Sequence, residues 1–446
     1  MSRVAGTRRR LAGAIGTCLA LGLLAGCGWM GDDDKPPLPG ERISVMLVDQ
    51  DLEPDPQLSD LQVRLPPPYI NPDWPQAGGS TTHAMHHLMV AEQLSRAWTA
   101  SIGSGTSGRR RLLTLPIVAE GKVFTMDLDF EIRAFELKTG RQLWAFEAEP
   151  PGRDTDAFGG GLAYGGGKLF VGTGFAELLA IDPSAGKELW RSRLPAPMRG
   201  APTIALGVVL AITVDNQTTA FDAQTGERSW NHTGFAETAG LLGGASPAVL
   251  SGIAIAPYSS GEVFALRLNN GRPAWSDNLT AVRRADAVSS LADIRALPVI
   301  DRDVVFAISH ASRMVALDLR TGTRLWDRNI GGLHMPWVAG EYIFLVNNQQ
   351  QVLAITRRGG RVKWITQLRQ WEDEEDRTDP VTWVGPILAG DRLILGSSLG
   401  DILSVSPYTG QVLGKVDAGD GVRISPIVAD GTLLILTDSG TLQAYR

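Results

Sequence analysis

Short apolar stretches separated by glycine-containing polar turns recur along the chain from about residue 98 to its end. Residues 201–230 read APTIALGVVLAITVDNQTTAFDAQTGERSW and show one complete unit, in which turns divide the chain into four short stretches. Four short strands joined by tight turns are typical of a propeller blade. The pattern therefore predicts an all-β fold made of four-stranded antiparallel blades.

Each unit ends in one frame, in which a small residue is followed ten residues later by a tryptophan. The frame reads AFELKTGRQLW from Ala134, AIDPSAGKELW from Ala180, AFDAQTGERSW from Ala220, ALRLNNGRPAW from Ala265, ALDLRTGTRLW from Ala316 and AITRRGGRVKW from Ala354. Its glycine suits the positive φ of a hairpin turn. We interpret the tryptophan as a residue that packs between neighbouring blades, and not as a platform for a ring-shaped ligand.

Two further frames are incomplete. SVSPYTGQVLG, from Ser404, has Gly414 at the tryptophan position, and a last frame begins at Ala444, just before the final Arg446. Starts from 134 to 444 give a mean spacing of about 44 residues, as in blade repeats. Trp98 has no frame of its own, so its strand is expected to complete the last blade. We predict an eight-bladed β-propeller over residues 74–446, its ring closed by the N-terminal strand.

The N-terminus has the features of an export signal. Residues 1–26 carry four arginines before the apolar run LAGAIGTCLALGLLAG, which is too short and glycine-rich for a good spanning helix. The run ends in LAGC, which resembles the lipobox of bacterial lipoproteins and makes Cys27 the expected site of lipid attachment. Gly28, in place of an aspartate, favours the outer membrane. The alternative is an ordinary signal cleaved near Ala25.

Residues 27–73 are rich in proline and aspartate, which predicts a flexible tether. The alternative is that the apolar residues 43–48, ISVMLV, add an edge strand or serve as a docking peptide. Removing the four signal arginines lowers the formal net charge from −6 to −10. Such an acidic chain lacks the basic footprint of a nucleic-acid-binding protein. The two cysteines are Cys18 and Cys27, so the mature chain has no disulfide and must fold by packing alone.

The AxDxxTGxxxW repeat resembles the PQQ-type propeller repeat. Together with the lipobox, the eight blades and the opening NPDWPQAGGSTTHAMHHL (residues 71–88), it makes the chain similar to the BamB family of outer-membrane assembly lipoproteins. The resemblance implies a scaffold without catalytic residues, metal or cofactor on the periplasmic side of the outer membrane. Its implied partners are the POTRA domains of the β-barrel insertase, other components of the BAM complex, and unfolded outer-membrane proteins.

The same resemblance implies two partner-binding loops. A hydrophobic-Arg-Gly pattern places Met198, Arg199 and Gly200 in the first loop, and the acidic position of the second falls on Asp293. Arg295 stands where the family pattern has another aspartate, which alters the charge of that loop. Both segments follow a frame tryptophan and precede an inner strand, so we expect them on one face, with an exposed Arg199 as interface anchor. The alternative is a solvated Arg199 or an internal ion pair.

Other candidate chemistry is weaker. His83, His86 and His87 could ligate a metal, but no cysteine or acidic pattern accompanies them. The run WEDEEDRTDP (residues 371–380) lacks the spacing of a calcium loop, so we interpret it as a solvated inter-blade loop. A PQQ-dependent quinoprotein is the competing function, but such enzymes typically pair adjacent cysteines. A glycan-binding propeller would need exposed channel aromatics, for which Trp337 and Trp383 are the candidates although core packing is their default.

Overall fold

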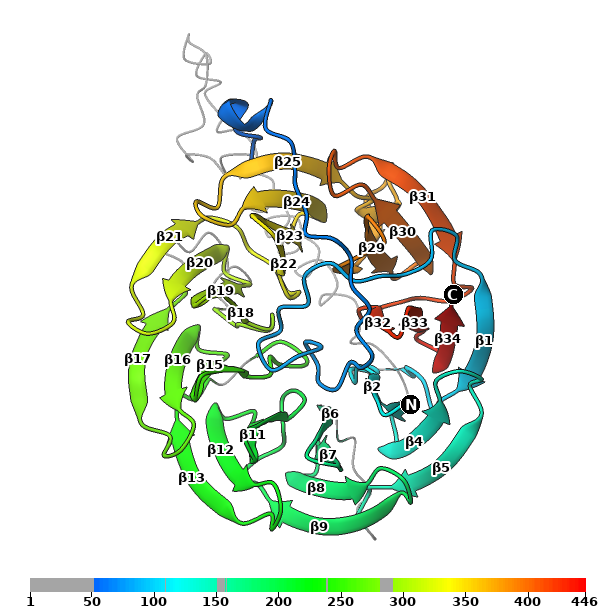
Figure 1. Cartoon of the computed structure of the whole chain (residues 1–446), viewed down its shortest axis with the longest axis vertical. Coiled ribbons are helices and arrows are strands. Elements are labelled where there is room, and N and C mark those ends of the chain that lie inside the picture. The colour runs from blue at the N-terminus through cyan, green and yellow to red at the C-terminus, as the bar shows by residue number, and fades with distance from the viewer. Residues whose placement is uncertain (1–51, 109, 151–156, 158, 238–239, 281–291) are drawn as a thin grey trace, which may run out of the picture. The chain divides into compact units, whose positions relative to one another are not determined.

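The computed structural model describes residues 52–446 except 109, 151–156, 158, 238–239 and 281–291. Eight four-stranded sheets stand around a central channel, and Figure 1 shows them as a ring. The only helical element among the described residues is the 3₁₀ turn η1 (Pro56–Leu58). In the same part of the chain no helix is long and apolar enough to cross a membrane. The predicted eight-bladed β-propeller is confirmed.

We number the blades in chain order, and the strands of each run from the channel outward. Blades 1 to 4 consist of β2 (Ile117–Ala119), β3 (Lys122–Met126), β4 (Glu131–Glu136), β5 (Gln142–Glu147); β6 (Gly160–Gly165), β7 (Lys168–Thr173), β8 (Glu177–Asp182), β9 (Lys187–Arg193); β10 (Thr203–Ala205), β11 (Val208–Ile212), β12 (Gln217–Asp222), β13 (Arg228–Thr233); and β14 (Ala248–Leu250), β15 (Ile253–Pro257), β16 (Glu262–Arg267), β17 (Pro273–Asn278).

Blades 5 to 8 consist of β18 (Val299–Asp301), β19 (Val304–Ser309), β20 (Arg313–Asp318), β21 (Arg324–Arg328); β22 (Trp337–Ala339), β23 (Tyr342–Val346), β24 (Gln351–Thr356), β25 (Val362–Gln367); β28 (Trp383–Ala389), β29 (Arg392–Ser397), β30 (Asp401–Val405), β31 (Val412–Asp417); and β32 (Ile427–Ala429), β33 (Thr432–Leu436), β34 (Thr441–Tyr445), β1 (Arg96–Ser101). Between blades 6 and 7 lies a two-stranded hairpin of β26 (Trp371–Asp373) and β27 (Thr378–Pro380).

The repeated frame has the same structural meaning in each of the six blades that carry its tryptophan. Its small residue pairs directly with its tryptophan across the third and fourth strands, as Ala220 does with Trp230. The tryptophan's indole N–H then donates to a backbone carbonyl of the next blade, for Trp230 that of Leu268 at 2.8 Å. The ring also covers the next blade's turn glycine, since a Cβ on Gly271 would lie 2.4 Å from Trp230. The predicted inter-blade packing of the tryptophans is thereby confirmed.

The ring closes as the sequence predicts. Strand β1 pairs antiparallel with β34, and this register places Trp98 opposite Ala444. Ser95 and Arg446 exchange backbone hydrogen bonds of 2.8 and 3.0 Å. The last blade therefore takes its outer strand from the N-terminal side of the chain, which leaves no gap between the first and last blades.

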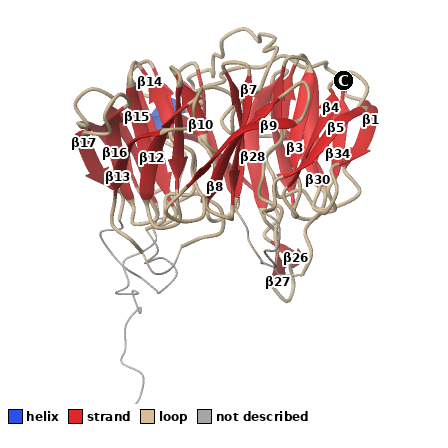
Figure 2. Ribbon diagram, turned by 90° about the horizontal axis from the view of Figure 1, so that it is seen from below, coloured by secondary structure: helices blue, strands red, loops and turns tan. Residues whose placement is uncertain are grey.

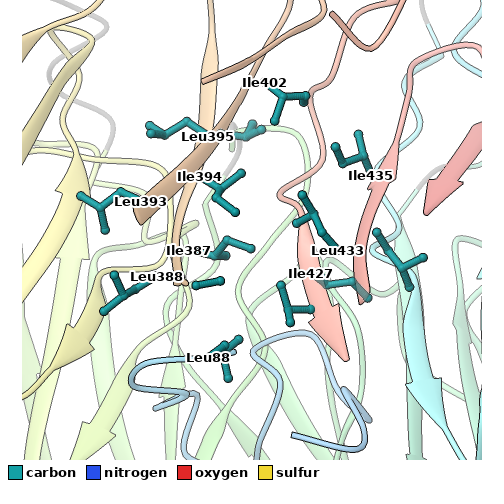
Figure 3. Close-up of a cluster of buried hydrophobic side chains, with 14 of the residues drawn as sticks. Leu88, Ile387, Leu388, Leu393, Ile394, Leu395, Ile402, Ile427, Leu433 and Ile435 are labelled. Carbon is teal, nitrogen blue, oxygen red and sulfur yellow. The ribbon is translucent and has the colours of Figure 1, made fainter. Parts of the chain in front are cut away.

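The seam between blades 7 and 8 lacks a tryptophan. Gly414 stands at the frame position opposite Ser404, and blade 8 has no covalent turn between its third and fourth strands that an indole could cover. Aliphatic side chains fill the inner part of this seam, as Figure 3 shows around Leu88. They belong to one buried cluster that includes Ile387, Leu388, Leu393, Ile394, Leu395, Ile402, Ile427, Leu433 and Ile435.

The segment 69–90, which we call the strap, winds over the middle of the ring and is blue in Figure 1. It makes hydrogen bonds to the innermost strand of every blade or to a residue beside it. In blade order the partners are Trp74 with Val118, Pro75 with Tyr164, Gln76 with Ile204, Thr81 with Val249, Thr82 with Ile300, His86 with Trp337, Leu88 with Leu388, and Asn71 with Val428. One short segment therefore joins all eight blades.

The structure differs from the expected tether at its C-terminal end. Residues 27–51 lie outside the described residues, as does the signal segment with Cys18. From Leu52 on, the chain is packed on the propeller. The carboxylate of Asp55 pairs with Arg361 at 2.6 Å, and the backbone N–H of Asp55 donates to the carbonyl of Val362. Val63 is buried in the core. Proline-rich composition predicted a flexible chain up to residue 73, but these contacts with blade 6 fix its last part.

Candidate functional site

The two predicted partner loops meet in a buried ion pair. Nη2 of Arg199, before β10, lies 2.9 and 2.8 Å from the two carboxylate oxygens of Asp293, before β18. Arg199 is only 6% exposed and Asp293 only 1%. A charge-assisted pair withdrawn from water holds its two segments firmly only while both partners are present. The pair thus ties the loop before blade 3 to the loop before blade 5.

The loop between β13 and β14 is held between these two segments. The backbone N–H of Leu241 donates to Asp293 at 2.7 Å, and Arg199 also donates to the carbonyl of Gly243 at 3.4 Å. Gly200 permits the close approach, because a Cβ there would lie 2.4 Å from the oxygen of Gly244. Arg199, Asp293 and the β13–β14 loop that both of them contact therefore form one connected unit.

The expectation of an exposed Arg199 is wrong, because Asp293 accepts its guanidinium inside the protein. Met198 is also fully buried, where its thioether packs so close to Gly172 that a Cβ there would lie 2.2 Å from the sulfur. Two side chains that sequence reasoning missed are exposed on the loop between β13 and β14: Phe235 at 73% and Leu242 at 48%. In the sequence they stand in HTGFAETAGLLGGAS (residues 232–246), and only the position of large apolar residues between two strand patterns could have indicated them.

Arg295 lines the central channel together with Arg199 and Gly200. Burial lowers the pKa of its guanidinium, the charge of Asp293 opposes this, and the charge of Arg199 adds to it. The departure from the family pattern at this position therefore places positive charge in the channel.

The three histidines do not converge. Nδ1 of His83 lies 2.7 Å from the carbonyl of Pro298, and Nδ1 of His87 lies 2.8 Å from that of Pro66. Nε2 of His86 lies 3.7 Å from the carboxylate of Asp301, at the end of β18 in blade 5. Each ring is thus engaged in holding the strap in place. Within the described ranges, no three His, Cys, Asp or Glu side chains are grouped as a metal site would require.

The remaining candidates take structural positions. The acidic run forms the β26–β27 hairpin, which projects from one face of the propeller in Figure 2 with its carboxylates exposed. Trp337 and Trp383 are buried, and Trp337 stacks on Trp74 with ring centroids 6.3 Å apart. Neither can stack on a sugar in the channel, so the aromatic platform that a glycan-binding propeller would need is not formed by these residues.

Comparison with known sequences agrees with this arrangement. A family model described as outer membrane protein assembly factor BamB matches residues 128–366. BamB of Shewanella oneidensis is 27% identical over 354 residues, which cover 78% of this chain and 87% of that protein. BamB of Escherichia coli K12 is 27% identical over 352 residues, with the same two shares.

Solved structures share the fold. BamB from Moraxella catarrhalis has a TM-score of 0.68 at 16% identity, covering 79% of this chain and 100% of that one. A quinohemoprotein alcohol dehydrogenase from Comamonas testosteroni has a TM-score of 0.64 at 15% identity, covering 84% and 80%. At such identities the likeness shows the fold alone. The family model, by contrast, matches more than half of the 446 residues, so this chain belongs to the family of outer membrane protein assembly factor BamB.

Proposed function

We propose that this chain is a non-catalytic scaffold lipoprotein of the outer-membrane β-barrel assembly complex. In this role it binds the POTRA domains of the barrel insertase, acts with other components of the complex, and aids the insertion of unfolded outer-membrane proteins. Cys27 carries the lipid anchor, which holds the propeller at the periplasmic face of the outer membrane. Membership of the BamB family supports the role. The β13–β14 loop, which is hydrogen-bonded to Arg199 and Asp293, supplies the binding surface.

The observation that carries the proposal is the exposure of Phe235 and Leu242 on the β13–β14 loop, which the buried Arg199–Asp293 pair contacts at Leu241 and Gly243. Large apolar side chains exposed on a rigid support are typical of interface anchors. In this arrangement Met198, Arg199, Gly200 and Asp293 act by holding the loop, and the anchors make the contact. Arg295 contributes positive charge at the central channel.

Affinity capture of the tagged full chain from gently solubilised outer membranes tests this surface. We expect the double variant Phe235→Ser/Leu242→Ser to lose the insertase while remaining folded. Leu206→Ser is the matched control, because Leu206 is 81% exposed in the β10–β11 turn, away from these loops. Equal capture by the double variant and the native chain would keep the function and reject the surface. Absence of the insertase from native captures would reject the function.

The positioning role is tested by exchanging the charges of the buried pair. Arg199→Asp or Asp293→Arg alone places like charges together, so each single variant should lose capture. The double variant Arg199→Asp/Asp293→Arg restores an ion pair and should recover part of it. Recovery would show that the pair acts by position and not by direct recognition of the partner.

The anchor is tested separately. We expect Cys27→Ser to release the propeller from the membrane fraction into the soluble periplasmic fraction, and metabolic labelling with palmitate to mark the native chain alone. A membrane-bound Cys27→Ser chain would contradict the anchor without affecting the partner surface.

A further inference from the structure

A cavity of about 140 Å³ lies in the central channel. Its lining comes from the strap, through Trp74 and Ala77, and from the inner end of every blade, so it sits on the axis of the ring. A cavity of roughly 150 Å³ holds a benzene-sized molecule. The space is therefore large enough for a small organic ligand.

The charge of the lining is positive. Arg199, Arg295 and Arg423 contribute to it, and no aspartate or glutamate among the described residues belongs to the lining. Arg199 is neutralised by Asp293, and Arg423 by an ion pair with Asp438. The cationic charge that remains within the lining is that of Arg295.

Arg295 has no hydrogen-bond acceptor or ion-pair partner among the described residues. The nearest acid, Asp293, already accepts from Arg199 through both oxygens and from the backbone of Leu241. A half-buried guanidinium without an anion is unfavourable. Its planar fork of donors matches a carboxylate or a phosphate.

A second polar group in the lining also lacks a partner. Trp74 is 2% exposed, and its buried indole Nε1 has no hydrogen-bond acceptor. His334 adds no charge near neutral pH, because burial and the charge of Arg295 lower its pKa to about 3. Because Nε1 of Trp74 has almost no exposed surface, the donor group that the lining offers to a ligand is the guanidinium of Arg295.

Most of the other side chains in the lining are apolar. Leu112, Leu113, Leu115, Leu297 and Leu333 are among them, and such side chains favour a hydrocarbon or aromatic body over water. A fully hydrated ion would gain nothing from them. The combination of the unpaired guanidinium and an aliphatic wall selects a ligand that has both an anionic head and an apolar body.

We propose that the central cavity is a binding site for a small monocarboxylate whose apolar part is about the size of a benzene ring. The carboxylate pairs with Arg295, and the leucine side chains enclose the apolar part. The proposed contact residues Phe235 and Leu242 do not belong to the lining, although Arg199 and Gly200, which hold their loop, do.

Titration of the full chain with phenylacetate, followed by ligand-observed NMR and calorimetry, tests the site. We expect saturable binding, with its neutral analogue phenethyl alcohol at least about tenfold weaker because the charged contact is lost. Arg295→Gln should weaken phenylacetate binding by a similar factor. Arg358→Gln is the matched control, because Arg358 is 85% exposed and lies outside the lining.

Leu333→Trp provides a second route, since it fills the cavity while keeping Arg295, and it should abolish binding even if Arg295→Gln fails to fold. Absence of saturable phenylacetate binding at millimolar concentration would overturn the proposal. Equal affinity for the alcohol, or for the folded Arg295→Gln variant, would also overturn it. Inorganic phosphate that binds as tightly as phenylacetate would do the same, because the apolar wall would then contribute nothing.

Discussion

The indole nitrogen of Trp98 donates a 3.0 Å hydrogen bond to the backbone carbonyl of Leu137. Trp98 lies on β1, which completes blade 8, and Leu137 follows the third strand of blade 1. The contact is the same one that every other frame tryptophan makes with its following blade. Here it joins the first and last blades, together with the hydrogen bonds of Arg446 to the carbonyls of Lys138 and Leu137, so the closure of the ring uses the repeat's own packing.

Truncation of this residue should destabilise the protein strongly. We expect Trp98→Ala to lower the free energy of unfolding by about 3–5 kcal/mol, because it leaves a cavity between blades 8 and 1. Urea denaturation followed by circular dichroism measures the change. Trp371→Ala is the control of the same residue type, since Trp371 lies on the projecting β26–β27 hairpin; a loss of equal size there would argue against a seam-specific effect.

A tryptophan introduced at position 414 should add little to the stability of the protein. A Cβ at Gly414 meets no atom within 4 Å, and blade 8 offers no turn glycine for an indole to cover. We therefore expect Gly414→Trp to change the free energy of unfolding by no more than about 0.5 kcal/mol, as is usual for surface substitutions. Stabilisation of several times that amount in the same urea experiment would mean that the seam has room for the ring.

The strap should be part of the cooperative fold. Gln76 donates to the carbonyl of Ile204 at 3.1 Å and accepts from its N–H at 2.9 Å. Gln76→Ala leaves both buried backbone groups without partners, at about 1–3 kcal/mol each. Gln57→Ala, in an exposed turn, is the control. Limited proteolysis should show whether the strap of Gln76→Ala is cut before the blades unfold, which is expected if it detaches first.

The blades could be predicted from the sequence because one local rule repeats in every frame. A small residue opposite a tryptophan and a glycine under the next ring are contacts set by short-range spacing, so Ala220 and Trp230 already indicate them. The strap could not be predicted in this way. Its partners are separated by up to 357 residues, as Asn71 and Val428 are, and single hydrogen bonds to successive blades leave no periodic pattern.

The candidate site was predicted in position but not in geometry. The resemblance to the BamB family indicated Arg199 and Asp293, the repeat placed their loops on one face of the propeller, and the two side chains do lie together. Their pairing was not predicted, because sequence spacing does not show whether a loop arginine meets water or a carboxylate 94 residues away. For the same reason, the sequence did not show that Arg295 lines the channel.

The buried ion pair should matter more for stability than an exposed one. Asp293→Ala leaves the Arg199 guanidinium without its partner, and breaking a buried pair in this way costs about 3–5 kcal/mol. Glu341→Ala removes a half-exposed partner of Arg302 and should cost no more than about 1 kcal/mol. Thermal and urea unfolding of both variants measures the difference. Similar small losses would mean that water reaches Arg199 when Asp293 is absent.

Acid should loosen the strap through His83. Burial lowers the pKa of this side chain from 6.5 to about 4, and its contact with the carbonyl of Pro298 only partly opposes the shift. Because the folded pKa lies below the unfolded one, the unfolded chain binds more protons between these two values. The stability contributed by neutral His83 is thus fully present above about pH 6.5 and is lost progressively as the pH falls toward 4.

The size of this effect can be measured by substitution. A shift of this extent corresponds to about 3 kcal/mol, so urea midpoints of the native chain should fall between pH 7 and pH 4 by more than those of His83→Gln. Glutamine keeps a donor for Pro298 but does not titrate. His334 still titrates in the variant, since its pKa is also lowered, to about 3, so part of the dependence should remain. Identical pH profiles for the two chains would mean that His83 is protonated without release of the strap.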